Sequence, residues 1–536
     1  MKASIAGCII AAVVGLCAIT SSHANVLDPD DFRDERGVML EPKYYAWSQV
    51  GGNVNVETND FRESNFRVAL SGDGSTMAVG APLVNESQGA VRVTRLNQTS
   101  GKWELMGSDI VGDSPDNFAG ASVSLSKDGT ILAVGYPADI ERAESGACCD
   151  RTFVRVFQWN SEQNDWEQLG ADVLDVEIFF PPDQDFIFLT SQAGWTLSLS
   201  DDGMYMAIGA PNFFRMGKGY VGQVRVYNFV SSSNEWKQVG LPIEGDLSSN
   251  GNAGFSLAFS GDGTTLAVGD PFATNGTGIV RIFKWNDDWE LYGNIIVGDE
   301  ENDHAGFSIS LSVNGKILAV GFPGHGPGGL VRVYQFRSDN NWDQVGTDIY
   351  PDPNMAFFLS PKNDGQTVSI SANGLTLAIA APGTVVNEGR VGLARVVRLN
   401  ATLNDWEMVG NIIPCETRYT EDGYGTELVS LSADGKRLVV GAPMHNTCQE
   451  TDFACLYAPQ DYSTNWTGHV RAFDILEVES SDFFTIVDPI GEIFTTTAPT
   501  KSPTATAQLG KPTSAAPKKS SLFHFILLSV TFASLL

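Results

Sequence analysis

Apolar and polar residues alternate over short stretches of this chain, and the stretches themselves recur. In AGFSISLSVNG, Phe307, Ile309 and Leu311 alternate with serines, which is the period of a β-strand. Asn314-Gly315 then predicts a two-residue hairpin turn with positive φ at both positions. The apolar stretches ILAVGF, VRVYQF and NWDQVG follow in order. We therefore predict that residues 305–346 form a four-stranded antiparallel meander.

This unit occurs seven times, and repetition at a regular spacing is the signature of a repeat architecture. A Ser-x-Asp-Gly or Ser-x-Asn-Gly turn follows each first strand, at 71–74, 126–129, 200–203, 260–263, 312–315, 371–374 and 432–435. Each second strand ends in a proline. Each third strand carries an arginine: Arg92, Arg155, Arg225, Arg281, Arg332, Arg395 and Arg471.

A Trp-x-x-apolar-Gly segment closes only the first six units, from WELMG (103–107) to WEMVG (406–410). The seventh unit lacks one, whereas an extra copy, WSQVG (47–51), precedes the first unit. A ring of blades must close, because an open ring would leave a strand edge unpaired. The chain is therefore predicted to be all-β. Residues 44–476 are predicted to form a seven-bladed β-propeller of four-stranded antiparallel blades, closed by an N-terminal strand that completes the last blade.

Segments such as AGFSISLSVNGKILAVGFP (305–323) resemble FG-GAP repeats, the blades of the integrin α-chain propeller. Gly306-Phe307 matches the "FG" element and Gly441-Ala442-Pro443 matches "GAP". The resemblance implies a propeller and, in integrins, calcium in a D-x-D-x-D-G-like loop. Here that connection shrinks to a turn with one carboxylate, while calcium takes six to eight oxygens. We therefore predict no metal ligands and no cofactor, with the acidic loop GDEENDHAG (298–306) as a weaker cation candidate.

The arginines of the third strands also invite an interpretation. Five outer strands place an acid directly after the tryptophan, as in Glu104 and Glu407. We predict that the arginines pair with these acids across the strands and fix the register, which is a structural role. The repeated tryptophans are likewise predicted to pack the blades.

The beginning of the chain departs from the repeat. Lys2, an apolar run and then Ser22-His23-Ala24 predict a secretory signal peptide over residues 1–24, followed by a lead segment, 25–43. Sequons at Asn85, Asn97, Asn275, Asn400 and Asn465 agree with passage through the secretory pathway, and so predict N-glycosylation.

The end of the chain also departs from it. A connecting segment (477–494) leads to a Ser/Thr/Pro-rich stretch (495–521), which is typical of an O-glycosylated stalk. The apolar tail 522–536 has 15 residues, fewer than the ~20 of a membrane span, and it follows small residues and a polar spacer. We expect a GPI signal and display at the cell surface. A simple tail anchor or transmembrane end and free secretion are the alternatives.

The net charge limits the partners that we predict, and the cysteines are candidates for a disulfide. Acidic residues outnumber Lys plus Arg by 64 to 34, and this net charge of -30 would repel nucleic acid and anionic lipid. We predict no nucleic-acid partner, and membrane contact only through the C-terminal anchor. Cys448 and Cys455 are the first disulfide candidates, with Cys415 as a competitor.

The longest irregular segments should share one face, because second-to-third and blade-to-blade connections lie at the same end of a meander. Functional residues concentrate on such loops. The candidate ligand-binding residues on this face are Phe179, Phe180, Phe186, Arg215, Met355, Phe357 and Phe358. The aromatic members could instead pack on one another and plug the ring.

Catalytic motifs are missing from the sequence: there is no H-E-x-x-H, no G-x-S-x-G and no phosphate loop, so no catalytic residue is assigned. His304, His325, His445 and His469 are scattered along the chain and form no motif. The main prediction is a non-enzymatic extracellular recognition or adhesion protein with a protein or glycan ligand. One alternative is a secreted hydrolase or lyase, which convergent histidines or acids at the mouth of the central channel would favour. The other is a structural cell-wall or matrix component.

Overall fold

The computed structural model divides the chain into two units, Met1–Phe483 and Phe484–Leu536. It describes parts of the first unit only: residues 44–55, 67–137, 152–174, 191–215, 218–245, 251–326, 328–351, 367–381, 385–386, 389–390, 393–414, 429–442 and 469–478. Within these residues no helix has the length and apolar character needed to cross a membrane.

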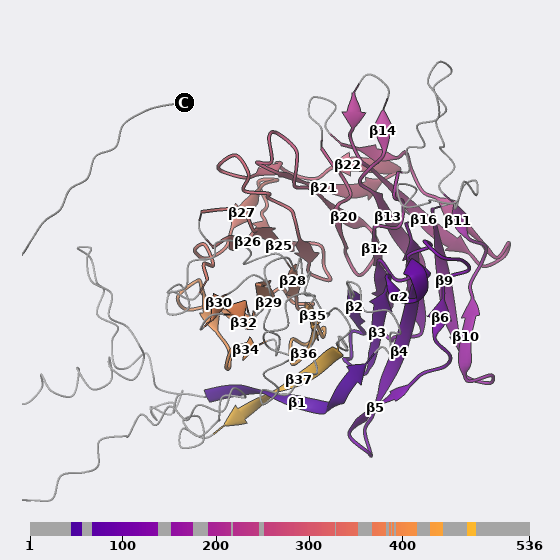
Figure 1. Cartoon of the computed structure of the whole chain (residues 1–536). Coiled ribbons are helices and arrows are strands. Elements are labelled where there is room, and N and C mark those ends of the chain that lie inside the picture. Colours follow the sequence, from indigo (N-terminus) through magenta and orange to yellow (C-terminus); the bar gives the residue numbers. More distant parts are fainter. Residues whose placement is uncertain are drawn as a thin grey trace, which may run out of the picture. The chain divides into compact units, whose positions relative to one another are not determined.

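The described residues form seven small antiparallel sheets arranged as the blades of a β-propeller (Figure 1). Blade 1 contains β2 (Arg67–Leu70), β3 (Thr76–Ala81), β4 (Ala90–Asn97) and β5 (Lys102–Leu105), with β6 (Ile110–Val111) beside β4. Blade 2 contains β7 (Val123–Leu125), β8 (Ile131–Tyr136), β9 (Phe153–Asn160) and β10 (Asp165–Gln168), with β11 (Val173–Leu174) beside β9.

Blades 3 and 4 repeat this order. Blade 3 contains β12 (Thr196–Leu199), β13 (Tyr205–Ala210), β16 (Gln223–Val230), β17 (Glu235–Gln238) and the short β18 (Ile243–Glu244). A separate hairpin of β14 (Phe214–Arg215) and β15 (Gly219–Tyr220) lies between its second and third strands. Blade 4 contains β19 (Ser256–Phe259), β20 (Thr265–Asp270), β21 (Ile279–Asn286), β22 (Asp288–Leu291) and β23 (Ile296–Val297).

The remaining blades complete the ring. Blade 5 contains β24 (Ile309–Leu311), β25 (Ile317–Phe322), β26 (Leu330–Phe336) and β27 (Trp342–Gln344). Blade 6 contains β28 (Thr367–Ile370), β29 (Thr376–Ala381), β32 (Leu393–Asn400), β33 (Asp405–Met408) and β34 (Ile413–Pro414), with the hairpin β30 (Val385–Val386) and β31 (Gly389–Arg390). Blade 7 contains β35 (Val429–Leu431), β36 (Arg437–Ala442), β37 (His469–Val478) and β1 (Tyr44–Asn55).

The N-terminal strand closes the ring as predicted. β1 pairs antiparallel with β37, in a register that sets Trp47 opposite Ile475 and Val50 opposite Ala472. In Figure 1 the indigo β1 and the yellow β37 run side by side although they come from opposite ends of the sequence. The first strands close as well, since the backbone N–H of Leu70 in blade 1 donates to the Ser430 hydroxyl in blade 7.

The Ser-x-Asp/Asn-Gly turns form a second closed circle. The residue after each serine donates its backbone N–H to its counterpart in another blade, over 2.8–3.1 Å, in the order Gly72, Lys127, Asp201, Gly261, Val313, Ala372, Ala433 and back to Gly72. The turn itself differs from the prediction. Of the two residues predicted to have positive φ in the blade 5 turn, Gly315 does and Asn314 does not. Asn314 instead accepts the Ser312 hydroxyl and the Lys316 N–H. These residues therefore hold the turn together, which agrees with a structural role.

The tryptophans form the outer circle. Each indole N–H donates to a backbone carbonyl of the neighbouring blade, as Trp342 does to Tyr292 at 2.8 Å and Trp47 does to Val409 at 2.9 Å. The acceptor is the apolar residue of the neighbour's Trp-x-x-apolar-Gly segment. Each Trp-x-x-apolar-Gly segment therefore forms the outer strand of its own blade and also supplies the carbonyl that accepts the indole N–H of the neighbouring blade.

The predicted arginine pairing is wrong in its partner. Glu104 lies opposite Arg95 in the register of β4 and β5, three residues beyond Arg92. The first half of β4 instead faces β6, so Arg92 reaches Asp109 at 2.6 Å. The pairing remains structural, because the same ion pair recurs between Arg155 and Asp172.

Candidate functional site

Two loops of the long-loop face meet at the start of blade 5. One is the acidic loop 298–306, which connects blades 4 and 5. The other follows β25 and contains Gly324-His325-Gly326. The Gly324 N–H donates to the backbone oxygen of Asp303 at 3.1 Å and so ties the loops together. Gly324 is required there, because a Cβ would lie 1.7 Å from the Asn302 backbone oxygen.

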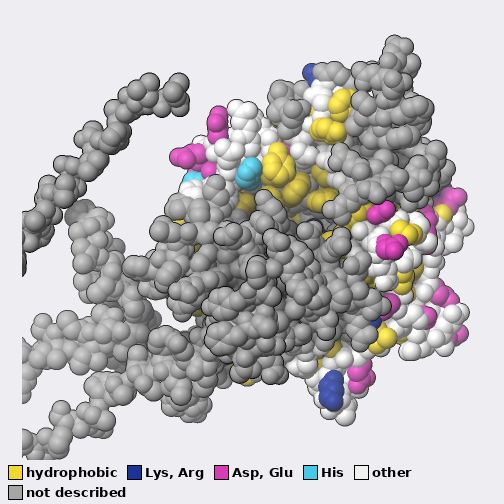
Figure 2. All heavy atoms as spheres, viewed as in Figure 1, with side chains coloured by type: hydrophobic (Ala, Val, Ile, Leu, Met, Phe, Trp, Pro, Cys, Tyr) yellow, Lys and Arg dark blue, Asp and Glu magenta, His cyan; other side chains and the backbone are white. Residues whose placement is uncertain are grey.

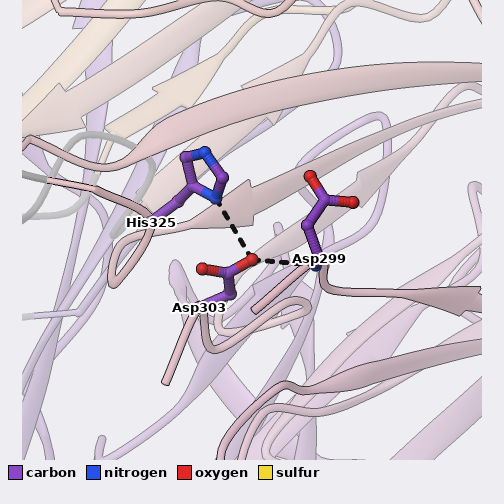
Figure 3. Close-up of side chains that lie close together, drawn as sticks. All are labelled: Asp299, Asp303 and His325. Atoms are coloured by element: carbon purple, nitrogen blue, oxygen red, sulfur yellow. Dashed lines mark hydrogen bonds and ion pairs between the residues drawn. The ribbon is translucent and has the colours of Figure 1, made fainter. Parts of the chain in front are cut away.

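This contact places His325 against a buried carboxylate. The side chain of Asp303 is only 2% exposed, and its Oδ2 lies 3.1 Å from His325 Nδ1. The same oxygen accepts the backbone N–H groups of Asp299 and Glu300, each at 2.9 Å. Figure 3 shows His325 and Asp299 on two sides of this carboxylate. A carboxylate fixed in this way can orient an imidazole with its proton on Nδ1, which leaves Nε2 as an acceptor.

Another blade shows what the turn alone requires. In the matching loop, GDSPDNFAG (112–120), Asn117 takes the place of Asp303 and accepts the N–H groups of Asp113 and Ser114 at 2.9 and 3.0 Å. An amide oxygen therefore suffices to close this turn. The turn therefore does not need the negative charge of Asp303. That charge lies against the imidazole of His325.

Asp299 is held from the other side by an arginine. Arg332 Nη2 lies 2.6 Å from Asp299, while its Nε lies 2.8 Å from Asp348. The hydrogen bond to Asp348 is the largest of the effects that raise the pKa of Arg332 above its usual range. In turn, the hydrogen bond from Arg332 holds the pKa of Asp348 at about 2, against the opposing effect of burial. Arg155 makes the same double contact with Asp113 and Asp172, so this clamp is part of the repeat.

A divalent cation is the other ligand to consider for this group of side chains. One ligand atom each from Asp299, Asp303 and His325 lie within 4.8 Å of one another. The acidic loop predicted as the weaker cation candidate is thus joined by a histidine. However, Arg332 already holds Asp299, and Asp303 Oδ2 already accepts two backbone N–H groups. A metal would have to compete with these bonds, so the arrangement favours an imidazole–carboxylate pair.

A second histidine, His304, lies beside this pair and against the exposed ring of Phe272. His304 Nδ1 lies 3.2 Å from the Pro271 backbone oxygen, and its Cδ2 borders the position of Gly324. Its ring packs edge-on against Phe272, with centroids 5.3 Å apart. In the view of Figure 2, hydrophobic side chains gather beside a histidine with acidic side chains nearby.

Most of the predicted ligand-binding residues fall outside the described residues, namely Phe179, Phe180, Phe186, Met355, Phe357 and Phe358; so do Asn465, Cys415, Cys448 and Cys455. Arg215 is described, and it pairs with Glu244 at the β14–β15 hairpin. The structure brings it into no contact with the His325–Asp303 pair. A cavity lined by residues of blades 2 and 3, including Val173, Ile208 and Tyr227, is also separate from that pair.

This pair was not predicted from the sequence, because His325 lies 22 residues beyond Asp303 and matches no catalytic motif. One signal was present, however. GDEENDHAG differs from GDSPDNFAG by carrying Asp303 where Asn117 stands and His304 where Phe118 stands. Departures of one repeat from another mark the positions that the fold does not explain.

Comparison of the sequence with protein-family models and with curated proteins finds no match. Three similar solved structures are Kuenenia stuttgartiensis hydrazine synthase, a candidate 6-phosphogluconolactonase from Bacteroides uniformis and a periplasmic gluconolactonase from Pseudomonas aeruginosa. All are 14% identical, with TM-scores of 0.43, 0.43 and 0.42 in that order. They cover 72%, 69% and 71% of this chain and 94%, 89% and 98% of their own.

These comparisons correct the main functional prediction. The similar propellers are named for enzymatic activities and include lactonases, so the prediction of a non-enzymatic recognition or adhesion protein is replaced by the hydrolase alternative, which stays a proposal. At this identity and these TM-scores, the likeness carries no argument about the substrate. The chemistry of this chain has to come from its own side chains.

Proposed function

We propose that the chain is a hydrolase in which His325, oriented by Asp303, activates water. The observation that carries the proposal is the bond between a buried carboxylate and an imidazole at 3.1 Å, at a position where the repeat needs only an amide. His325 is partly exposed, and Nε2 is the ring nitrogen that the contact with Asp303 does not occupy. A histidine and an acid thus converge between two loops at the start of blade 5.

The reaction that suits this pair is hydrolysis of an open-chain ester or a lactone. Nε2 of His325 takes one proton from water while the water oxygen bonds to the acyl carbon. When the tetrahedral intermediate collapses, the bond to the alkoxy oxygen breaks and the imidazolium returns the proton to that oxygen. Asp303 stays ionised throughout and stabilises the imidazolium. The products are a carboxylic acid and an alcohol, or one hydroxy acid.

The first experiment measures hydrolysis by residues 25–494, using small open-chain esters and five- and six-membered lactones. Asp303→Asn is the informative variant, because Asn117 shows that asparagine closes this turn. We expect kcat to fall about 10²–10⁴-fold in this variant and in His325→Gln, the range seen when general-base catalysis is lost. Asn117→Asp is the matched control and should leave the rate unchanged.

A second measurement does not depend on the substrate. The whole chain has six histidines, so selective ¹⁵N-histidine labelling gives a simple spectrum. His325 should carry its proton on Nδ1, and Asp303→Asn should change this tautomer. No hydrolysis above the rate of Asp303→Asn, together with an unchanged tautomer in that variant, would rule out the proposed function.

The same proposal places the enzyme outside the cell. The signal peptide predicted at residues 1–24, the sequons and the stalk-like stretch 495–521 support secretion or surface display. Peptide mass spectrometry of the native protein would find an N-terminus at Asn25 and a processed C-terminus; an intact tail 522–536 would contradict lipid anchoring.

A further inference from the structure

Three successive blades carry a large aromatic ring at the same place. Trp195, Phe255 and Phe307 each follow the Ala-Gly pair that opens the first strand of blades 3, 4 and 5. The ring centroids of Trp195 and Phe255 lie 6.3 Å apart, and those of Phe255 and Phe307 lie 4.9 Å apart. Phe272, from the loop after β20, joins Phe255 at 5.4 Å. We call these four residues the aromatic arc.

The fold does not require these rings. The same place in blade 2 holds Ala121, which follows Ala119-Gly120 in the same way and is buried. Phe272 is 37% exposed, and the other rings of the arc are half-buried. A run of partly exposed aromatic side chains that the backbone does not need indicates a binding surface.

The arc leads to the proposed catalytic pair. Phe272 contacts His304, and the His304 ring borders Gly324, the neighbour of His325. The acidic loop also carries the exposed Asp299, Glu300 and Glu301, and Glu301 accepts a hydrogen bond from Asn275 in the loop that holds Phe272. A ligand on the arc would therefore meet aromatic faces, imidazole nitrogens and carboxylate oxygens together.

We propose that the aromatic arc is a subsite for a neutral sugar ring, which would make the substrate an acylated or lactone-bearing saccharide. The proposal rests on the proposed hydrolase function. A pyranose has a face of C–H groups, which stack on the electron-rich faces of aromatic rings, and an edge of hydroxyl donors, which suit carboxylate acceptors.

Charge selects among the possible occupants. The three acids next to the arc and the net charge of -30 repel uronic acids, phosphates and anionic lipid surfaces. The rings of the arc are mutually inclined, by 53° between Phe255 and Phe307 and by 89° between Phe255 and Phe272. Inclined rings offer separate stacking faces, which suit successive puckered sugars better than one flat ligand.

The test measures, by saturation-transfer NMR, the binding of neutral β-glucan, mannan, galactan and chitin oligomers to the Asp303→Asn variant of the protein. Uronic acid oligomers and phosphatidylcholine vesicles serve as the anionic and lipid probes. We expect millimolar or tighter binding of at least one neutral oligomer, weakened at least tenfold in Phe272→Ala. Tyr220→Ala is the matched control, since this tyrosine is 41% exposed and also packs edge-on against one ring, that of Phe214.

The outcomes separate the two proposals. Sugar binding that depends on Phe272, with no ester or lactone hydrolysis, supports the subsite and overturns the hydrolase. Hydrolysis that depends on His325, with no saccharide bound or with equal binding in Phe272→Ala, overturns the subsite and leaves the hydrolase standing. Preference for the uronic acid oligomers or for the vesicles also overturns the subsite.

Discussion

Single side chains at the blade 4–blade 5 junction act through tightly shared partners. Arg332 serves Asp299 and Asp348 at once, over 2.6 and 2.8 Å, and it also lies over the Phe322 ring at 5.0 Å. The neighbouring Tyr334 is partly buried, and this loss of contact with water raises its pKa to about 12. The clamp thus fixes the backbone on which the acidic loop begins. Asp303 and His325 are not members of this clamp and form a pair of their own.

The pH dependence of this clamp follows from the pKa of Asp348, which the Arg332 hydrogen bond lowers from 3.8 to about 2. A lowered folded-state pKa adds stability above the unfolded pKa, and this stability is lost as pH falls through the folded value. Asp348→Asn should therefore reduce the free energy of unfolding by about 1 kcal/mol at pH 5, and by progressively less towards pH 2. Urea unfolding at pH 5, 4 and 3 measures the difference; a difference independent of pH would contradict the assignment.

Gly324 gives a second test at the residue scale. A Cβ at this position would lie 1.7 Å from the Asn302 backbone oxygen, so Gly324→Ala must push the His325 loop away from Asp303. We expect the tautomer of His325 to change and at least a tenfold loss of hydrolysis, with little change in melting temperature. Gly52→Ala is the control, because nothing lies within 4 Å of its Cβ position. Full activity in Gly324→Ala would mean that the loop contact does not position His325.

At the scale of strands and turns, each motif has two partners. The Trp-x-x-apolar-Gly segment pairs with its own third strand and also accepts an indole N–H from a neighbouring blade. The turn residue after each serine joins the circle of backbone bonds. Blade-to-blade bonds of this kind explain why a short motif is kept in every unit.

Closure by β1 can be probed through one such indole. Trp47 is 5% exposed and donates to the Val409 oxygen at 2.9 Å, so Trp47→Phe leaves a carbonyl without its bond and a small cavity. We expect a loss of about 2 kcal/mol in unfolding free energy. Trp342→Phe in blade 5 should cost a similar amount. Only Trp47→Phe should speed proteolysis at the N-terminal strand, and equal rates for the two variants would argue against a special role for β1.

How far the sequence determines the structure differs between these elements. The alternation around Ile309, the proline-ended second strands and the displaced WSQVG predict the blades, their number and the closing strand, because these features are local and repeated. The partner of Arg92 is not predictable in the same way. It depends on β6, a two-residue strand that adds to the edge of β4 and leaves almost no periodic pattern.

The candidate site was harder still to predict. Asp303 and His325 sit on different loops, and neither is part of a repeated motif, so their 3.1 Å contact arises only when blades 4 and 5 are placed side by side. What the sequence does contain is the exchange of Asn117 for Asp303 between matching loops. Comparing blades within one chain therefore finds candidates that motif searches cannot.

At the scale of the whole molecule, the three circles of contacts make the ring depend on both ends of the propeller sequence. First strands, turns and tryptophans each close between blade 7 and blade 1, through Leu70 and Ser430, through Ala433 and Gly72, and through Trp103 and Val50. The last of these contacts belongs to β1. Removing β1 thus opens the outer circle and exposes an edge of β37, while the two inner circles keep their partners.

A chain that begins at residue 56 tests this dependence. It lacks β1, including the buried Trp47 and Val54, so blade 7 has three strands and β37 offers unpaired backbone groups to other molecules. We expect a lower melting temperature and dimers or larger species in light scattering. A chain that begins at residue 44 should behave like the full ectodomain. Adding the 44–55 peptide should restore the monomer and bind saturably in fluorescence anisotropy. A stable monomer beginning at residue 56 that ignores the peptide would show that the inner circles alone hold the propeller closed.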